Sequence, residues 1–379
     1  MLSFNFHMPT NIVFGAGRLA ELETLPAFPK GGKAMIVIGQ SGNILRAGYL
    51  DRVQGLLGAR GVASVVFDGV RANPRTEDVD AAAAKAREAG DEFLVGLGGV
   101  SVIDSAKFFA LAAAHTGPFW GSMAASACAK GSALPLIAIP TTSGTGTEGN
   151  SIAVLCGPEG KRGFVHPGFA PAIALVDPEL ALSCPQHLTA ITGMDAFFHA
   201  AECFLSTARQ PMTDMLCLEA VNLITRFLPT AVENGADINA RTAMAWASTA
   251  AGMCLSLSSP ISQHALEYSF SGSNPDSPHG AGLVLLSRSY FAKLIELAAD
   301  DEETSDRLLN LAMAMGFGLE EDPEVHPFLE ALEALLEAVG LADLLPEDLG
   351  FQRGQVAALT SAAMQLTGAR HFVNTPVKM

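Results

Sequence analysis

The chain has 379 residues, of which 49% are hydrophobic and 16% charged, with 23 Lys and Arg against 39 Asp and Glu. This composition excludes a disordered protein, and the length predicts two domains, because one hydrophobic core rarely serves so long a chain. The net charge of −16 and the lack of a basic cluster argue against nucleic acid as a partner.

The sequence carries no signal for export or for a membrane. Residues 1–7 lack the basic start and apolar run of a secretory signal, and no apolar run approaches the roughly 18 residues that a membrane span needs. Six cysteines stand at positions 128, 156, 184, 203, 217 and 254 and form no CxxC pair. We therefore expect a cytoplasmic protein with reduced, mostly buried thiols and no membrane partner.

The first half of the chain alternates short apolar runs with helical segments. Strands are predicted at 33–38, 62–67, 91–97 and 136–139. Between them, residues 76–89 and 101–114 have helical patterns, the first with acidic residues in its first turn and Gly90 at its end. Strands that alternate with helices predict a parallel sheet covered on both faces.

After about residue 180 the strand signals end and helical patterns rich in Ala, Leu and Met follow. Helices are predicted at 187–206, 212–230, 236–257, 283–299 and 327–339. The acidic run 300–303 is interpreted as a solvated loop and helix start. The sequence thus predicts an α/β domain over residues 1–180 and an all-α domain over residues 181–379.

A pair of glycines, Gly98 and Gly99, lies between a predicted strand and the helix that begins near Ser101. Glycines at this point let the backbone approach a pyrophosphate, which the free N–H groups of the helix N-terminus would bind. A tight strand-to-helix turn is the alternative interpretation. The segment also departs from the GxGxxG pattern of many dinucleotide sites.

A second polar loop follows the strand 136–139. Residues 140–148 read PTTSGTGTE, with hydroxyl groups on Thr141, Thr142, Thr145 and Thr147. Such a dense array of donors suits phosphate, ribose and an amide, whereas a polar loop with a helix cap is the structural alternative. Two such loops at the ends of strands favour a binding site.

Four side chains in the helical half form a candidate metal site. Asp195 and His199 are four residues apart, which places a carboxylate and an imidazole on one face of a helix. With His264 and His279 they supply the ligand types that a divalent metal such as Fe or Zn takes. The other histidines are interpreted as structural or surface residues: His7, His115, His166, His187, His326 and His371.

With these motifs the chain resembles the iron-containing (group III) alcohol dehydrogenase family. Residues 98–107, GGVSVIDSAK, are similar to the family's GGGSxxDxAK loop, and 140–148 to its PTTxGTGSE segment. Residues 193–200, GMDAFFHA, are similar to GMDALxHA, and His264 and His279 match the later metal histidines. The opening segment 9–17 is also family-like, so the resemblance spans nearly the whole chain.

The resemblance implies an N-terminal dinucleotide-binding domain, a C-terminal metal-binding domain and a cofactor in the cleft between them. Fe²⁺ or Zn²⁺ would be held by Asp195, His199, His264 and His279, which are also the catalytic residues. As a Lewis acid, the metal would stabilise the alkoxide of a small alcohol or aldehyde substrate while hydride passes to or from the nicotinamide. Family members of this kind are expected to form homodimers or higher homo-oligomers. The cofactor contacts are assigned to Gly39, Ser41, Gly98, Gly99, Ser101, Asp104, Thr141, Thr142, Thr145, Thr147 and Lys161.

Three positions depart from the family pattern. Val100 replaces a glycine, and because a β-branched residue is costly at positive φ, it must keep an ordinary backbone. Tyr268 stands where many members carry a second histidine. Gly39 stands where NAD-dependent members often carry Asp, whose carboxylate would repel a 2′-phosphate, so NADP(H) is preferred over NAD(H).

Two other functions remain open at this point. One is a zinc-dependent enzyme similar to glycerol dehydrogenase, and the other is a catalytically degenerate member that only binds a dinucleotide. The complete set of one Asp and three His favours catalysis. Side chains such as Ile152 and Cys254 are expected to line the substrate pocket, whose preferred alcohol the sequence does not identify.

Overall fold

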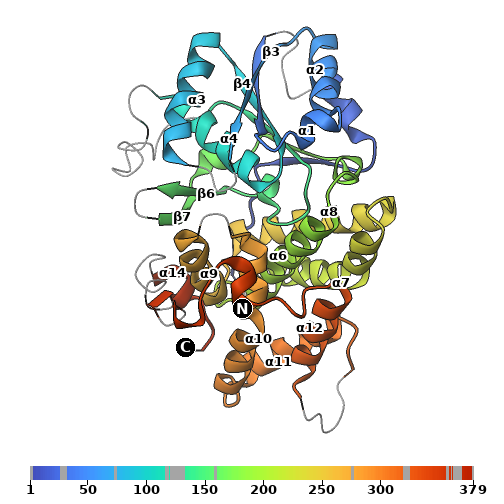
Figure 1. Ribbon diagram of the computed structural model, residues 1–379, viewed down its shortest axis with the longest axis vertical. Coiled ribbons are helices and arrows are strands. Elements are labelled where there is room, and N and C mark those ends of the chain that lie inside the picture. The colour runs from blue at the N-terminus through green and yellow to red at the C-terminus, as the bar shows by residue number, and fades with distance from the viewer. Residues whose placement is uncertain are drawn as a thin grey trace.

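The computed structural model divides into an α/β part and a helical part that lie one above the other along the longest axis (Figure 1). The two-stranded hairpin β6–β7 lies between them. The residues described are 3–25, 32–71, 75–115, 119, 133–157, 160–274, 277–318, 325–355, 358–359, 361 and 369–377.

The α/β part is built on a six-stranded sheet in the order β1-β8-β5-β4-β2-β3, and every pairing in it is parallel. Its strands are β1 (Asn11–Phe14), β2 (Lys33–Gly39), β3 (Ala63–Val70), β4 (Phe93–Gly98), β5 (Leu136–Pro140) and β8 (Ile173–Val176). In sequence, β3 follows β2 and lies on one side of it, and β4 then pairs with the other side of β2. The strand order therefore reverses between β2 and β4. Ligands of open α/β sheets bind at the carboxyl ends of such strands.

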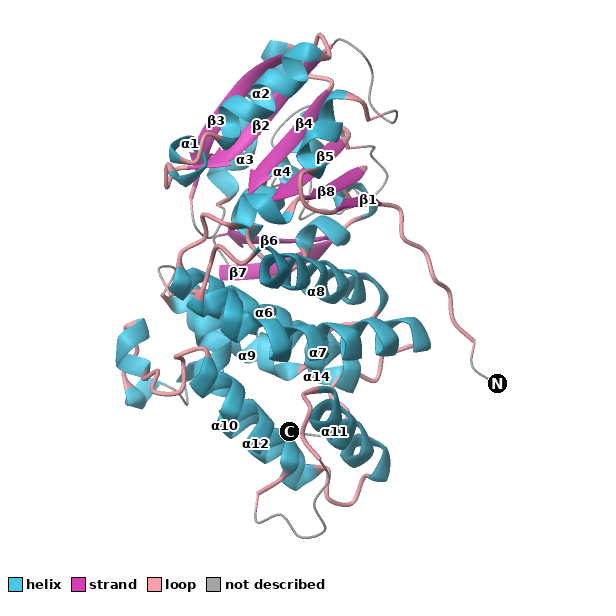
Figure 2. Ribbon diagram, turned by 90° about the vertical axis from the view of Figure 1, so that its right-hand side faces the viewer, coloured by secondary structure: helices cyan, strands magenta, loops and turns pink. Residues whose placement is uncertain are grey.

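Helices cover both faces of this sheet, as Figure 2 shows. Along β2, Met35 and Val37 point to the face that carries α3 (Thr76–Ala89) and α4 (Val100–Ala113). Ile36 and Ile38 point to the opposite face, which carries α2 (Tyr49–Ala59). Both faces are therefore apolar, and the predicted parallel sheet with helices on its two faces is confirmed.

The α/β part also contains strands that the sequence did not reveal. β1 and β8 are four residues long, too short for a periodic pattern. β6 (Ile152–Gly157) and β7 (Gly160–Val165) form an antiparallel pair apart from the main sheet. In β7, Lys161 and Arg162 stand between glycines, so its apolar alternation is weak.

The helical part packs around a core that includes Phe197, Phe198, Phe291 and Phe328. The predicted helices are found within a few residues of their expected bounds, although α10 begins four residues early. α9 has a Ser- and Gly-rich sequence, which explains why no helix was predicted for it. The helices are α6 (Gln186–Leu205), α7 (Pro211–Glu233), α8 (Ile238–Leu257), α9 (Ser262–Ser273), α10 (His279–Leu297), α11 (Glu302–Ala314), α12 (Pro327–Ala338) and the short α14 (Ala369–Val373).

Among the described residues, one helix is long and apolar enough to cross a membrane by length and composition, α7. It lies between α6 and α8 and buries a stripe with Cys217, Val221, Ile224 and Leu228 against the core. A single helix of this kind is weak evidence for a membrane span, because a core helix passes the same test. The predicted domain boundary at 180 falls between the end of β8 and the start of α6.

Candidate active site and metal centre

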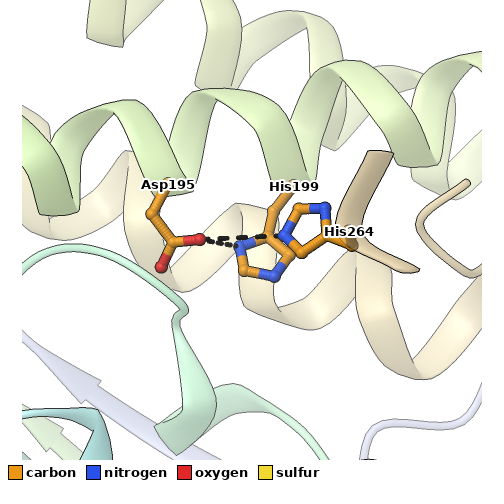
Figure 3. A group of neighbouring side chains, drawn as sticks. All are labelled: Asp195, His199 and His264. Carbon is orange, nitrogen blue, oxygen red and sulfur yellow. Dashed lines mark ion pairs between the residues drawn. The ribbon is translucent and has the colours of Figure 1, made fainter. Parts of the chain in front are cut away.

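Two neighbouring helices bring three ionisable side chains to one point. Asp195 and His199 project from one face of α6, and His264 projects toward them from α9 (Figure 3). Asp195 Oδ1 lies 3.3 Å from His199 Nδ1 and 3.7 Å from His264 Nε2. The ligand atoms of these three residues all lie within 4.8 Å of one another. This is the spacing of groups that share one ion.

These converging atoms are buried and have no hydrogen-bond partner among the described residues: Asp195 Oδ1, His199 Nδ1 and His264 Nε2. Leaving a buried polar atom unpaired costs about 1–3 kcal/mol, so three at one point would be a large penalty. A divalent cation would satisfy all three at once, and two imidazoles with a carboxylate are ligands that Fe²⁺ and Zn²⁺ both take. The residues present therefore fit a metal.

His279, in the first turn of α10, approaches Asp195 but is not one of the three residues whose ligand atoms all lie within 4.8 Å of one another. Its Nε2 lies 3.8 Å from Asp195 Oδ1, and its side chain is 19% exposed, so it is the most open of the four. The neighbouring Gly280 explains the approach, because a Cβ there would lie 2.1 Å from Ile191 O. Only a glycine lets the start of α10 rest on the backbone of α6.

Two buried glutamates that the sequence analysis missed support the histidines from behind. Glu202 Oε1 is hydrogen-bonded to His264 Nδ1, and Glu267 Oε2 to His279 Nδ1. Glu202 Oε2 also accepts the N–H of Ile261 at 2.8 Å, at the start of α9. A carboxylate on the far nitrogen fixes the tautomer of an imidazole and aims its other nitrogen at a metal.

Burial and mutual charge set the protonation of this cluster. Burial opposes ionisation of Asp195, but the imidazoles around it outweigh that effect and hold the pKa of Asp195 below its usual range. Burial and the neighbouring imidazoles lower the pKa of His199 to about 3, against the pull of Asp195. For His264, burial is outweighed by Glu202 and Asp195, which raise its pKa to about 10. An anionic Asp195 beside a neutral His199 suits a cation, which would displace the proton that the raised pKa leaves on His264.

Tyr268 lies one helical turn after His264 and lines the same cavity. Its ring stacks on His279, with centroids 5.5 Å apart and planes 28° from parallel, and Lys161 Nζ lies 5.6 Å from the ring centroid. Burial raises the pKa of Tyr268, so the phenol stays neutral. The side chain that replaces the family's second histidine thus packs against a candidate ligand.

The predicted glycines lie at the carboxyl edge of the sheet. Gly39 ends β2, Gly98 ends β4, and Gly98 pairs in register with Pro140 at the end of β5. Gly99 caps α4, which begins at Val100, so Val100 has an ordinary backbone, as expected, and it is helical. A Cβ on Gly98 would lie 2.7 Å from Val102 Cγ2, which shows that this glycine permits close packing of helix on strand.

The polar loop meets the same edge. Thr141 N donates to Gly98 O at 3.1 Å, and a Cβ on Gly99 would lie 3.1 Å from Thr142 Oγ1. Ser41 lies in the exposed turn after β2. Loops after three neighbouring strands therefore surround the N-terminus of α4, an arrangement suited to a pyrophosphate.

Three residues assigned to the cofactor have polar groups already engaged within the protein. Asp104 Oδ1 accepts a hydrogen bond from Thr147 Oγ1 at 2.6 Å, and Asp104 Oδ2 accepts from Val154 N at 2.8 Å. Both residues border the cavity, but these bonds fix the loop. Lys161 also borders the cavity and donates to Ser271 Oγ at 3.1 Å.

A cavity of about 450 Å³ separates the two halves of the site. From the α/β part it is lined by Ser101, Thr145 and Lys161, and from the helical part by Asp195, His199 and His279. Ile152 lines it as expected, whereas Cys254 is buried with its thiol 3.4 Å from the Cys217 thiol, and Leu255 lines the cavity instead. His187, which was interpreted as structural or surface, is exposed and also borders the cavity.

Known proteins match this chain over nearly its whole length. Residues 9–178 match the model of iron-containing alcohol dehydrogenases, and residues 189–379 match the C-terminal model of the same family. Alcohol dehydrogenase 4 of Saccharomyces cerevisiae is 32% identical over 372 residues, covering 97% of this chain and 94% of that protein. An NADPH-dependent butanol dehydrogenase of Clostridium saccharobutylicum is 32% identical over 327 residues, covering 81% and 82%.

A solved structure of an archaeal halo-thermophilic alcohol dehydrogenase from a Red Sea brine pool has the same fold. Its TM-score to this chain is 0.89 at 30% identity, and the match covers 100% of this chain and 97% of that one. The family models and the relatives point to the same family. The two models together span the α/β and helical parts, and the relatives match along nearly the whole chain. The chain belongs to the iron-containing alcohol dehydrogenase family.

Proposed function

We propose that this protein is a metal-dependent alcohol dehydrogenase and aldehyde reductase that exchanges hydride between NADP(H) and a small alcohol or aldehyde. Residues 1–180 would bind the dinucleotide and residues 181–379 the metal, Fe²⁺ or Zn²⁺. The observation that carries the proposal is the convergence of three unpartnered, buried ligand atoms of Asp195, His199 and His264 on one wall of a cavity. The opposite wall contains the start of α4.

Within this proposal, Asp195, His199, His264 and His279 hold the metal, which supplies Lewis acidity toward the substrate oxygen when bound. Glu202 and Glu267 keep two of the imidazoles oriented. The N-terminus of α4 binds the pyrophosphate and so directs the nicotinamide into the cavity. Apolar side chains exclude water from the reacting atoms: Val100, Ile152, Val154, Leu188, Ile191 and Leu255.

The test is a panel of short-chain and aromatic aldehydes with NADPH and NADH, run on one preparation whose metal content is measured. The expected result is turnover that needs both dinucleotide and metal. Turnover that survives complete removal of metal would contradict the metal assignment. Dinucleotide binding without any turnover would favour a binding protein that has lost catalysis.

The preference for NADP(H) rests on the loop after β2. Gly39 has no carboxylate to repel a 2′-phosphate, and Arg46, which the sequence analysis missed, folds over this loop. The Arg46 guanidinium donates to Ser41 O at 3.1 Å and would meet a Cβ on Gly42 at 2.9 Å. An Arg at this place is suited to a 2′-phosphate. The Clostridium saccharobutylicum relative is named as NADPH-dependent, although another relative is named as NAD-dependent.

Gly39→Asp should shift the preference toward NADH. A new carboxylate would accept a hydrogen bond from the ribose 2′-OH and repel a 2′-phosphate, so the ratio of kcat/KM with NADPH to that with NADH should fall on the order of tenfold or more. Gly39→Ala is the matched control, because a Cβ there meets Val102 Cγ2 at an ordinary 3.5 Å. A wild type that already prefers NADH would overturn this interpretation of the loop.

We also propose that the protein is a cytoplasmic homo-oligomer. Residues 3–7 form an exposed, extended arm ahead of β1, an edge strand of the sheet (Figure 2). Phe4 and Phe6 on this arm are 47% and 48% exposed and alternate with polar residues, as in a strand with one apolar face. A second copy of the chain would cover such a face. The described cysteines are free thiols, which agrees with a reducing compartment.

Replacing Phe4 and Phe6 together with serine should weaken this self-association. Sedimentation velocity at micromolar concentration is expected to show an oligomer for the wild type and monomer for the variant, because the arm loses its apolar side chains. Met215→Ser, which alters a still more exposed apolar side chain on α7, is the control and should leave the oligomer intact. A monomeric wild type would refute the proposal.

A further inference from the structure

Lys107 is a buried cation that lies outside the cavity and yet contacts the loop that lines it. Its side chain is completely buried in α4, one turn after Asp104. Five acceptors lie within hydrogen-bond distance of Lys107 Nζ and share its three N–H groups: Thr147 O and Oγ1 at 2.7 Å each, Asn150 O and Oδ1 at 3.1 Å each, and Ile152 O at 2.6 Å. All three partners line the cavity.

The same loop is held from its other side by the helical part. We call residues 145–152 the connecting segment. Gly146 packs directly on α8, since a Cβ on it would lie 2.0 Å from Ser248 O. Thr249 Oγ1 donates to Glu148 Oε1 at 2.8 Å, and Ser151 N donates to Ser256 Oγ at 3.3 Å. The connecting segment therefore joins α4 to the helical part that contains Asp195.

An ammonium group is chemically suited to this place. Three backbone carbonyls that point at one spot need donors, and a compact cation with three N–H groups supplies them where an apolar side chain would leave them unpaired. Burial opposes the charge and lowers the pKa of Lys107 to about 8, with Asp104 and Glu148 acting in the opposite sense. A charge kept in the interior at such a cost points to a role in geometry.

We propose that Lys107 is a positioning residue for the dinucleotide. By holding the connecting segment against α4, it sets the separation between the pyrophosphate at the N-terminus of α4 and the metal ligands Asp195, His199 and His264. The inference rests on the proposed function, because it assumes that a dinucleotide lies along this path. Lys107 acts through Thr147, Asn150 and Ile152 and touches neither substrate nor cofactor.

The test is Lys107→Met in the metal-loaded enzyme, with binding and turnover measured separately. The variant should bind NADPH about tenfold more weakly and turn over about tenfold more slowly, because the nicotinamide end is no longer held in place. Its affinity for 2′-phospho-ADP-ribose, which lacks the nicotinamide, should stay within about threefold, since α4 is intact. Metal content should equal that of the wild type.

Arg241→Met is the matched control for the loss of a buried cation. Arg241 is 3% exposed and donates to Thr189 Oγ1 at 2.8 Å and to Cys184 O at 3.0 Å, away from the connecting segment. The Arg241→Met variant should lose thermal stability, but the ratio of its affinity for NADPH to its affinity for 2′-phospho-ADP-ribose should equal that of the wild type. A Lys107→Met enzyme that behaves in the same way would overturn the positioning role.

If Lys107→Met does not fold, Thr147→Val takes its place. That change removes the hydroxyl that Lys107 and Asp104 share and keeps the shape of the side chain. It should shift the same affinity ratio in the same direction by a smaller factor, and an unchanged ratio would refute the proposal. Because the ratio is measured by calorimetry, a wild type without turnover would contradict the proposed function and leave this binding test valid.

Discussion

Replacing His264 with alanine should remove the metal and the activity together while the fold survives. His264 supplies a completely buried nitrogen that converges with Asp195 Oδ1 and His199 Nδ1, so its loss opens the cluster. Because metal polarisation of a substrate oxygen is worth several kcal/mol, kcat/KM should fall on the order of a thousandfold or more. Metal content by mass spectrometry and turnover on the same sample measure both effects.

The control for this variant is His326→Ala. His326 caps the start of α12 by accepting the N–H of Phe328 at 3.2 Å, and it lies outside the metal cluster. It should keep metal and activity while losing some stability. A His264→Ala enzyme with full metal occupancy and an unchanged circular dichroism spectrum would remove His264 from the ligand set.

The sequence was informative where chemistry depends on local spacing. Asp195 and His199 are one helical turn apart, so their shared face was predictable from period alone. The same rule places Glu202 one turn after His199 and Glu267 one turn after His264, but the hydrogen bonds of these carboxylates go to other histidines, His264 and His279. The two glutamates were missed because a buried glutamate has no signal of its own until its imidazole partner is placed.

Contacts between distant segments could not be predicted from the sequence, for a different reason. Lys107 binds carbonyl groups 40 to 45 residues away, and a carbonyl is present at every residue. Asp104 and Thr147 were both assigned to the cofactor because each lies in a segment that resembles a cofactor loop of the family, yet their side chains are hydrogen-bonded to each other. A motif therefore locates a site more reliably than it assigns each polar atom within it.

Glycines give the opposite case, in which local preference and tertiary packing disagree. Gly252 lies inside α8, where alanine would favour the helix by about 1 kcal/mol. In the folded protein, however, a Cβ on Gly252 would lie 2.0 Å from Gly146 O and 2.4 Å from the Gly146 carbonyl carbon. Backbone atoms have little freedom to move away from an added methyl group. A side chain at position 252 would therefore force the connecting segment and α8 apart.

Gly252→Ala should therefore destabilise the protein in spite of its better helix propensity. Forcing a methyl group into a filled contact costs about 1–3 kcal/mol, which outweighs the helix term, and the displaced connecting segment should weaken dinucleotide binding as well. Gly58→Ala in α2 is the control, since a Cβ there meets nothing within 4 Å and alanine should add about 0.5–1 kcal/mol of stability. Thermal unfolding of both variants beside the wild type gives the comparison. If Gly252→Ala were as stable as Gly58→Ala, the close contact between α8 and Gly146 would not exist in solution, and the connecting segment could not join the two halves of the site.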